Sequence, residues 1–140
     1  MRLVLRARSS HPDPVKKSPP TAAELAILRI LWRDGPATVK QVHEAVYAGT
    51  DTGYTSALKI LQNMLAKGLV SRATDARQHV YKAAVSERPT LNRLVRGWMD
   101  SAFSGSSLAL AMQALDARPI DQQELAELKA VIQRLEAGSD

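Results

Sequence analysis

The segment Tyr54–Lys67 (YTSALKILQNMLAK) constrains the fold more than any other part of the chain. The turn cluster Gly49–Gly53 precedes it and Gly68 follows it, which is the pattern of a helix between a turn and a left-handed cap. At about 100° per residue its apolar side chains fall on one arc and its polar ones on the other. The apolar arc, which predicts burial, comprises Ala57, Leu58, Ile60, Leu61, Met64 and Leu65.

The polar arc of this segment contains no carboxylate. Solvated helix faces usually mix Glu with Lys, whereas a face without acid does not repel phosphate. Hydroxyl, amide and ammonium groups are also the donors and acceptors that base edges require. The pattern therefore favours contact with nucleic acid over simple solvent exposure. The polar residues are Thr55, Ser56, Lys59, Gln62, Asn63 and Lys67, and the first five are the candidate contacts.

Two shorter helices are predicted before this segment. Thr21 and Glu24 have the spacing of a capping box directly after two prolines, and Asp34–Pro36 ends the helix they begin. Thr38 caps a second helix, in which Lys40 is a candidate phosphate contact. Two short helices joined by a tight turn containing glycine form a helix-turn-helix. The apolar stripe of the first helix is Leu25, Leu28 and Trp32, flanked by Ile27 and Leu31. The apolar stripe of the second helix is Val39, Val42 and Val46.

After Gly68 the hydrophobic period changes from helical to alternating. Leu69–Arg72 and His79–Lys82 are predicted strands around a loop at Asp75–Gln78. Three helices followed by a basic hairpin are the parts of a winged helix-turn-helix, with the hairpin as the wing. The wing offers Arg72, Arg77 and Lys82 for contacts with phosphate or the minor groove.

The net charge of +5 is unevenly distributed, with +7 over residues 1–85 and −2 over residues 86–140. This asymmetry suggests a part that faces a polyanion and a part with another task. We predict a flexible basic arm over 1–19, a winged-helix DNA-binding domain over 20–85 and a helical dimerisation domain over 86–140. The arm either adds phosphate contacts or is a solvated tail.

Residues 86–140 are predicted to form three short helices, starting near Pro89, at Ser106 and at a second capping box, Asp121 with Glu124. So many apolar positions cannot close a core in roughly 50 residues. These helices must pack on the first part or on a second chain, and a two-fold dimer is the commonest arrangement. The predicted interface residues are Leu91, Leu94, Val95, Trp98, Leu108, Met112, Leu115, Leu125, Leu128, Ile132 and Leu135.

Several functional classes are excluded by composition. The chain has no Cys, and its His residues (His11, His43 and His79) are scattered outside any metal or catalytic motif. We therefore expect no enzyme activity, cofactor or metal. No apolar run reaches the roughly 18–20 residues of a membrane span, and the first residues lack a secretory signal pattern, so we expect a cytoplasmic protein without membrane insertion.

The order of these segments resembles the penicillinase-repressor (BlaI/MecI/CopY) family of winged-helix regulators. Tyr54–Leu69 resembles the recognition helix of that family, and Thr21–Val42 is similar to its first two helices. Gly105-Ser106, Leu108 and Ile120–Glu136 are similar to its dimerisation region. The resemblance covers about residues 21–136.

The resemblance implies a homodimeric transcriptional repressor on an inverted-repeat operator in double-stranded DNA, typically controlling β-lactamase or related resistance genes. By position, Thr55, Ser56, Lys59 and Asn63 would face the major groove. It also implies release through a membrane sensor and proteolysis, or through metal in the copper-responsive branch. In some members an Asn-Phe bond is cut, and this sequence has Gln113-Ala114 there. The copper branch uses a C-terminal Cys cluster, which this chain lacks.

Two other functions fit the same fold. One is a winged helix that senses a small molecule in an apolar pocket between the wing module and the tail helices. The other is a winged helix used only for protein–protein assembly. Assembly surfaces favour aromatic residues and Met over Lys and Thr, so the polar arc of Tyr54–Lys67 argues against the second.

Overall fold

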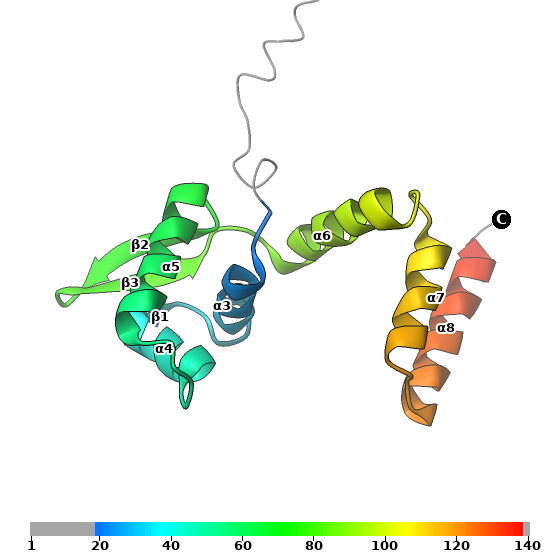
Figure 1. Cartoon of the computed structure of the whole chain (residues 1–140), viewed down its shortest axis with the longest axis horizontal. Coiled ribbons are helices and arrows are strands. Elements are labelled where there is room, and N and C mark those ends of the chain that lie inside the picture. Colours follow the sequence, from blue (N-terminus) through cyan, green and yellow to red (C-terminus); the bar gives the residue numbers. More distant parts are fainter. Residues whose placement is uncertain (1–18, 139–140) are drawn as a thin grey trace, which may run out of the picture. The chain divides into compact units, whose positions relative to one another are not determined.

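The computed structural model describes residues 19–138, and the basic arm predicted over 1–19 lies outside them apart from Pro19. The chain forms two compact units, one reaching Leu94 and one starting at Val95 (Figure 1). The elements are α3 (Ala22–Asp34), β1 (Ala37–Thr38), α4 (Val39–Tyr47), α5 (Tyr54–Lys67), β2 (Val70–Asp75), β3 (Gln78–Ala83), α6 (Glu87–Ala102), α7 (Ser107–Ala117) and α8 (Gln122–Gly138).

The first unit is a winged helix-turn-helix, as predicted, but its sheet has three strands instead of two. The strand order is β1-β3-β2, with both pairings antiparallel. The sequence did not indicate β1, because two residues are too few for an alternating pattern. Ala37 and Thr38 pair with Tyr81 and Val80 of β3, and Thr38 also caps α4.

The ends of the predicted helices are confirmed by their caps. Thr21 and Thr38 each accept a backbone N–H at 3.2 Å, and the Glu24 and Gln41 side chains accept the reciprocal bond at 2.9 Å. Gly68 takes the left-handed conformation (φ +81°) at the end of α5. Its N–H and that of the next residue donate back into the last turn at 3.2 and 2.9 Å. This closure turns the chain from helix directly into β2.

The core lies between the three helices and the sheet. In α3 it is centred on Ile27 and Leu31, which were predicted as flanks, whereas Leu25 and Trp32 are only half-buried. Trp32 donates its indole N–H to the Val85 carbonyl at 2.9 Å, so its polar edge must lie at the boundary of the core. The fully buried side chains are Ile27, Leu28, Val42, Ala57, Leu61, Met64, Leu69 and Tyr81.

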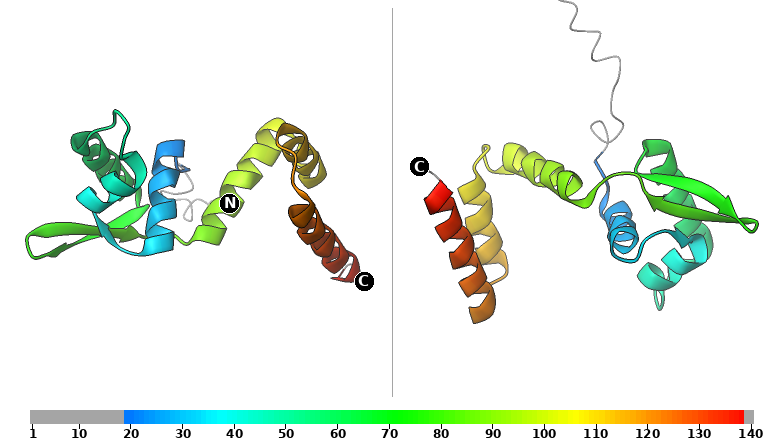
Figure 2. Two further views of the ribbon diagram at one scale, coloured as in Figure 1. Left: turned by 90° about the horizontal axis from the view of Figure 1, so that it is seen from below. Right: turned by 180° about the vertical axis from the view of Figure 1, so that it is seen from behind.

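The wing is longer than the sequence indicated, and Figures 1 and 2 show it extending beyond the helices of its unit. Asp75 and Gln78, predicted as loop residues, form the last strand pair. The turn therefore has two residues, Ala76 and Arg77, both with positive φ (50° and 72°). Two residues with positive φ form the type I′ turn that matches the twist of a hairpin, although Asn-Gly is its usual sequence.

Replacing Ala76 with Asn is expected to stabilise the first unit. A side chain other than Gly or Asn costs roughly 1–2 kcal/mol in the left-handed conformation, so Ala76→Asn should raise the unfolding free energy by about 0.5–1 kcal/mol. Urea denaturation followed by circular dichroism measures this difference. Ala73→Asn, in the exposed part of β2, is the control and should give no gain. An unchanged midpoint for Ala76→Asn would contradict the strain at this turn.

The second unit holds the end of α6 together with α7 and α8. Ser106 caps α7 by accepting the Ala109 N–H at 3.0 Å, and Asp121 and Glu124 form the predicted capping box before α8. Neither α7 nor α8 has a buried residue. The division between the units falls inside α6, whereas the predicted boundary preceded residue 86. Thr90, on the first turns of α6, is buried and belongs to the first unit.

Candidate nucleic-acid interface

The polar face of α5 points outward on a helix whose other face packs on the core, with Leu58, Ile60 and Leu65 of the predicted apolar arc only partly buried there. Ala57, Leu61 and Met64 have no exposed surface. Burial of one face fixes the rotation of α5 about its axis, so the opposite face is a rigid surface. All five predicted contacts on it are exposed: Thr55, Ser56, Lys59, Gln62 and Asn63.

Lys67 does not belong to this free surface, although its position on the polar arc suggested that it did. Its Nζ lies 2.6 Å from Glu24 Oε1, and the side chain is mostly buried. The two residues are 43 positions apart, so local spacing could not reveal the pair. From the sequence alone, Glu24 is predicted only as a capping residue.

The three cations predicted for the wing are exposed, but they do not form one cluster. Arg72 lies opposite Tyr81 and Lys82 lies opposite Ser71. Directly opposite residues share a face and successive residues alternate, so Arg72 and Lys82 lie on different faces of the hairpin. Arg77 is in the turn, at the far end of the wing. The wing therefore offers three separate cations.

The turn between α4 and α5 is held by side chains that sequence analysis did not assign to the site. His43 Nε2 lies 2.8 Å from the Thr52 carbonyl oxygen. Thr50 donates its hydroxyl to the Tyr47 carbonyl at 2.7 Å and accepts the Thr52 N–H at 3.2 Å. Burial raises the pKa of the Tyr47 hydroxyl. These bonds fix where α5 starts.

Lys40, the predicted phosphate contact on α4, is exposed in the first turn of that helix, close to its N-cap residue Thr38.

The second unit carries a set of large apolar side chains in contact with solvent. Trp98, Leu108 and Leu135 are 53%, 69% and 68% exposed in the single chain. Of the other predicted interface residues in this unit, Met112, Leu115 and Ile132 are exposed, and Val95, Leu125 and Leu128 are half-buried. The predicted interface residues Leu91, which is exposed, and Leu94, which is half-buried, belong to the first unit. Gln113 and Ala114 are also exposed, within the helical backbone of α7.

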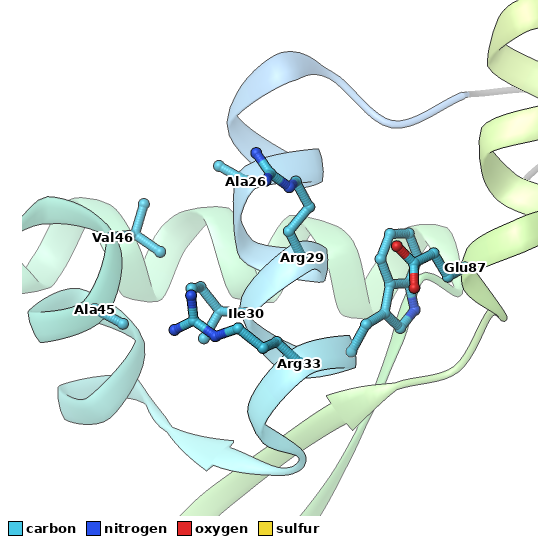
Figure 3. Close-up of a pocket in the computed structure, with 8 residues that line it drawn as sticks. Ala26, Arg29, Ile30, Arg33, Ala45, Val46 and Glu87 are labelled. Atoms are coloured by element: carbon cyan, nitrogen blue, oxygen red, sulfur yellow. The ribbon is translucent and has the colours of Figure 1, made fainter. Parts of the chain in front are cut away.

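A pocket of about 500 Å³ lies in the first unit between α3 and α4 (Figure 3). Its walls combine apolar Ile30 and Val46 with the charged side chains of Arg29, Arg33 and Glu87. Arg33 is also paired with Asp34 at 2.9 Å, and this pair lowers the pKa of the Asp34 carboxyl.

Among residues 19–138, no group of three or more His, Asp or Glu is placed to hold a metal, and no helix is long and apolar enough to span a membrane.

The chain is similar to known proteins along most of its length. Residues 20–134 match the family model described as penicillinase repressor. Two proteins of Mycobacterium tuberculosis, strains CDC 1551 and H37Rv, are both named transcriptional regulator BlaI. Each is 36% identical to this chain in an alignment of 121 residues that covers 82% of this chain and 83% of the relative. The YusO protein of Bacillus subtilis has a similar structure, with a TM-score of 0.51 and 14% identity over 97% of this chain and 92% of that one. This last likeness concerns the fold alone.

Proposed function

The chain belongs to the penicillinase repressor family of transcriptional regulators, and on this premise we propose that it is a homodimeric repressor of an inverted-repeat operator in double-stranded DNA. The family consists of regulators and not of enzymes. The observation that carries the proposal is the exposed, carboxylate-free face of α5, held rigid by the buried face behind it. Repression follows when the bound dimer occludes the promoter.

In this proposal α5 enters the major groove, as recognition helices of this class do. Lys59 can contact the O6 and N7 atoms of guanine, and Gln62 and Asn63 can pair with adenine. Thr55 and Ser56 supply hydroxyl contacts near the start of the helix. Phosphate contacts by Lys40 and the wing provide affinity that depends on salt and little on sequence.

The second unit provides the dimer interface in this proposal. The leucines Leu108, Leu115 and Leu135 of α7 and α8 are left exposed by residues 19–138, and a second copy offers the same surface. A two-fold arrangement would hold two recognition helices about 34 Å apart, one turn of DNA. Because the two recognition helices would be related by a two-fold axis, the operator that matches them is an inverted repeat.

The regulated genes and the release mechanism are proposals from the family description alone. We propose β-lactamase or other resistance genes as targets, and a membrane sensor pathway that ends in proteolysis. The Gln113-Ala114 bond is exposed but helical. Cleavage there would require local unwinding of α7, because the last turns of the helix would have to open to admit a protease.

Sequencing genomic fragments captured by the purified full-length protein tests the proposed function directly. We expect one shared inverted repeat, with half-sites separated by about one turn of DNA. Fragments with no common sequence would contradict operator recognition. The genes beside the captured fragments would show whether resistance genes are the targets.

Neutralising Arg77 at the wing turn is expected to weaken binding to every DNA sequence by a similar factor. Each lost phosphate contact reduces the slope of log affinity against log salt by about 0.9. Fluorescence anisotropy on operator and scrambled DNA across a salt series measures this slope for Arg77→Ala. Arg118→Ala, which removes an exposed cation from the second unit, is the matched control and should leave the slope unchanged. If the Arg77→Ala slope did not move, the wing turn would make no phosphate contact.

The pocket between α3 and α4 supports a second candidate, a regulator that senses a small molecule directly. The Arg29 guanidinium beside apolar walls suits an organic anion, whereas Arg33 is already paired with Asp34 and Glu87 adds a negative charge to the lining. Thermal unfolding with and without benzoate is a first test, because a ligand that binds the folded state raises the midpoint by mass action. A shift that Arg29→Ala removes would favour this candidate, and the absence of a shift for benzoate and similar anions would argue against it.

A further inference from the structure

One carboxylate joins the start of α3 to the end of α5. Glu24 is 5% exposed, and its Oε1 accepts both the Thr21 backbone N–H at 2.9 Å and the Lys67 ammonium at 2.6 Å. Thr21 in turn accepts the Glu24 N–H at 3.2 Å. The cap of α3 and the last turn of α5 therefore share a single acceptor.

Capping alone does not require a charged residue at this position. In the same chain Gln41 occupies the equivalent place in the capping box of α4, with the same 2.9 Å and 3.2 Å bonds. Gln41 is exposed, whereas Glu24 is buried. A buried carboxylate is costly unless it is paired, so its charge at this position serves the bond to Lys67.

The ion pair gives α5 a directional contact in addition to its apolar packing on the core. The apolar side chains behind α5 resist exposure to water, but hydrophobic burial is not directional. An ion pair with hydrogen-bond geometry is directional and fixes one atom against another. Lys67 lies one helical turn beyond Asn63 and two turns beyond Lys59, and the His43–Thr52 contact holds the opposite end of the helix.

We propose that the Glu24–Lys67 pair positions the polar face of α5 for sequence-specific binding, and that Lys67 itself does not touch DNA. This inference rests on the proposed function. In this account Glu24 and Lys67 are positioning residues, and losing the pair misaligns the base contacts of α5. Phosphate contacts on the wing and α4 are unaffected, so discrimination between sequences falls while the electrostatic part of binding remains.

The test uses the full chain with Lys67→Met and Glu24→Gln, the second of which keeps the capping box as Gln41 does. We expect each variant to lose tenfold or more in operator affinity, which corresponds to one good base contact. Affinity for scrambled DNA should change less than twofold, and the salt slope should stay constant. The double variant should be no worse than either single one, because both remove the same interaction. Lys67→Arg should retain most of the operator affinity.

Two controls separate this role from the alternatives. Arg77→Ala reports what a lost phosphate contact does to the salt slope, and Thr21→Ala weakens the α3 cap while leaving the ion pair. Circular dichroism gives the folded fraction of each variant, so affinities refer to folded protein.

Three outcomes would overturn the proposal. A slope lowered by about 0.9 for each protomer in Lys67→Met would make Lys67 a phosphate contact. Normal operator affinity in folded Lys67→Met and Glu24→Gln would make the pair merely stabilising. An unmodified chain without sequence preference would overturn the proposed function as well, and this outcome is distinguishable because it appears before any variant is compared.

Discussion

The double substitution Leu108→Glu and Leu135→Glu is expected to convert the proposed dimer to monomers and lower operator affinity by roughly 10²–10⁴-fold. Both side chains are more than two-thirds exposed in the single chain. In the proposed dimer they are buried, where an unpaired carboxylate is strongly disfavoured. Each monomer would then bind one operator half-site independently. In a dimer, binding of one protomer raises the effective concentration of the other at the second half-site, and monomers lose this gain.

The folded first unit should not change, because neither leucine belongs to its core. Sedimentation equilibrium measures the oligomeric state, and anisotropy with operator DNA measures affinity. Gln133→Glu places the same charge at an exposed polar position of α8 and should remain dimeric. A double variant that remained dimeric would move the interface away from α7 and α8.

The second large effect is expected for Lys59→Ala. Lys59 is exposed in the middle of the polar face of α5, where a side chain can reach the floor of the major groove. A good contact between Lys and guanine contributes about 1–3 kcal/mol of discrimination, and a dimer makes it twice. We therefore expect operator affinity to fall by at least tenfold, while the dimer remains intact.

Anisotropy with operator and scrambled DNA measures the affinity, and sedimentation measures whether the protein stays dimeric. Lys129→Ala removes an exposed lysine from α8 and should leave operator binding unchanged. Equal operator affinities of the Lys59→Ala variant and the parent chain would show that this face of α5 is not the recognition surface. The pocket between α3 and α4 would then become the more informative site.

Features defined by neighbouring residues were predictable. The capping boxes at Thr21, Thr38 and Asp121 and the left-handed cap at Gly68 follow from side chains that act within a few positions. The predicted helix over Tyr54–Lys67 has the same bounds in the structure. These features depend on helical periodicity and on local hydrogen bonds, so the sequence contains all the information they need.

Features that join distant parts of the chain were not predictable from spacing. Strand β1 exists because Ala37 and Thr38 reach β3, more than forty positions later. The wing turn adopts type I′ geometry without its usual residues, because the ladder between β2 and β3 extends to Asp75 and Gln78. That ladder also separates Arg72 from Lys82, which the sequence had grouped together.

The sequence by itself determined the order of the helices and of the two wing strands, the core-facing side of α5 and the polar residues on its opposite side. Only the tertiary structure decided that Lys67 pairs with Glu24 instead of belonging to the free polar surface of α5. The reason is physical: an amphipathic period specifies which side of a helix avoids water, but the partner of a charged group is whichever opposite charge the packed helices bring within reach.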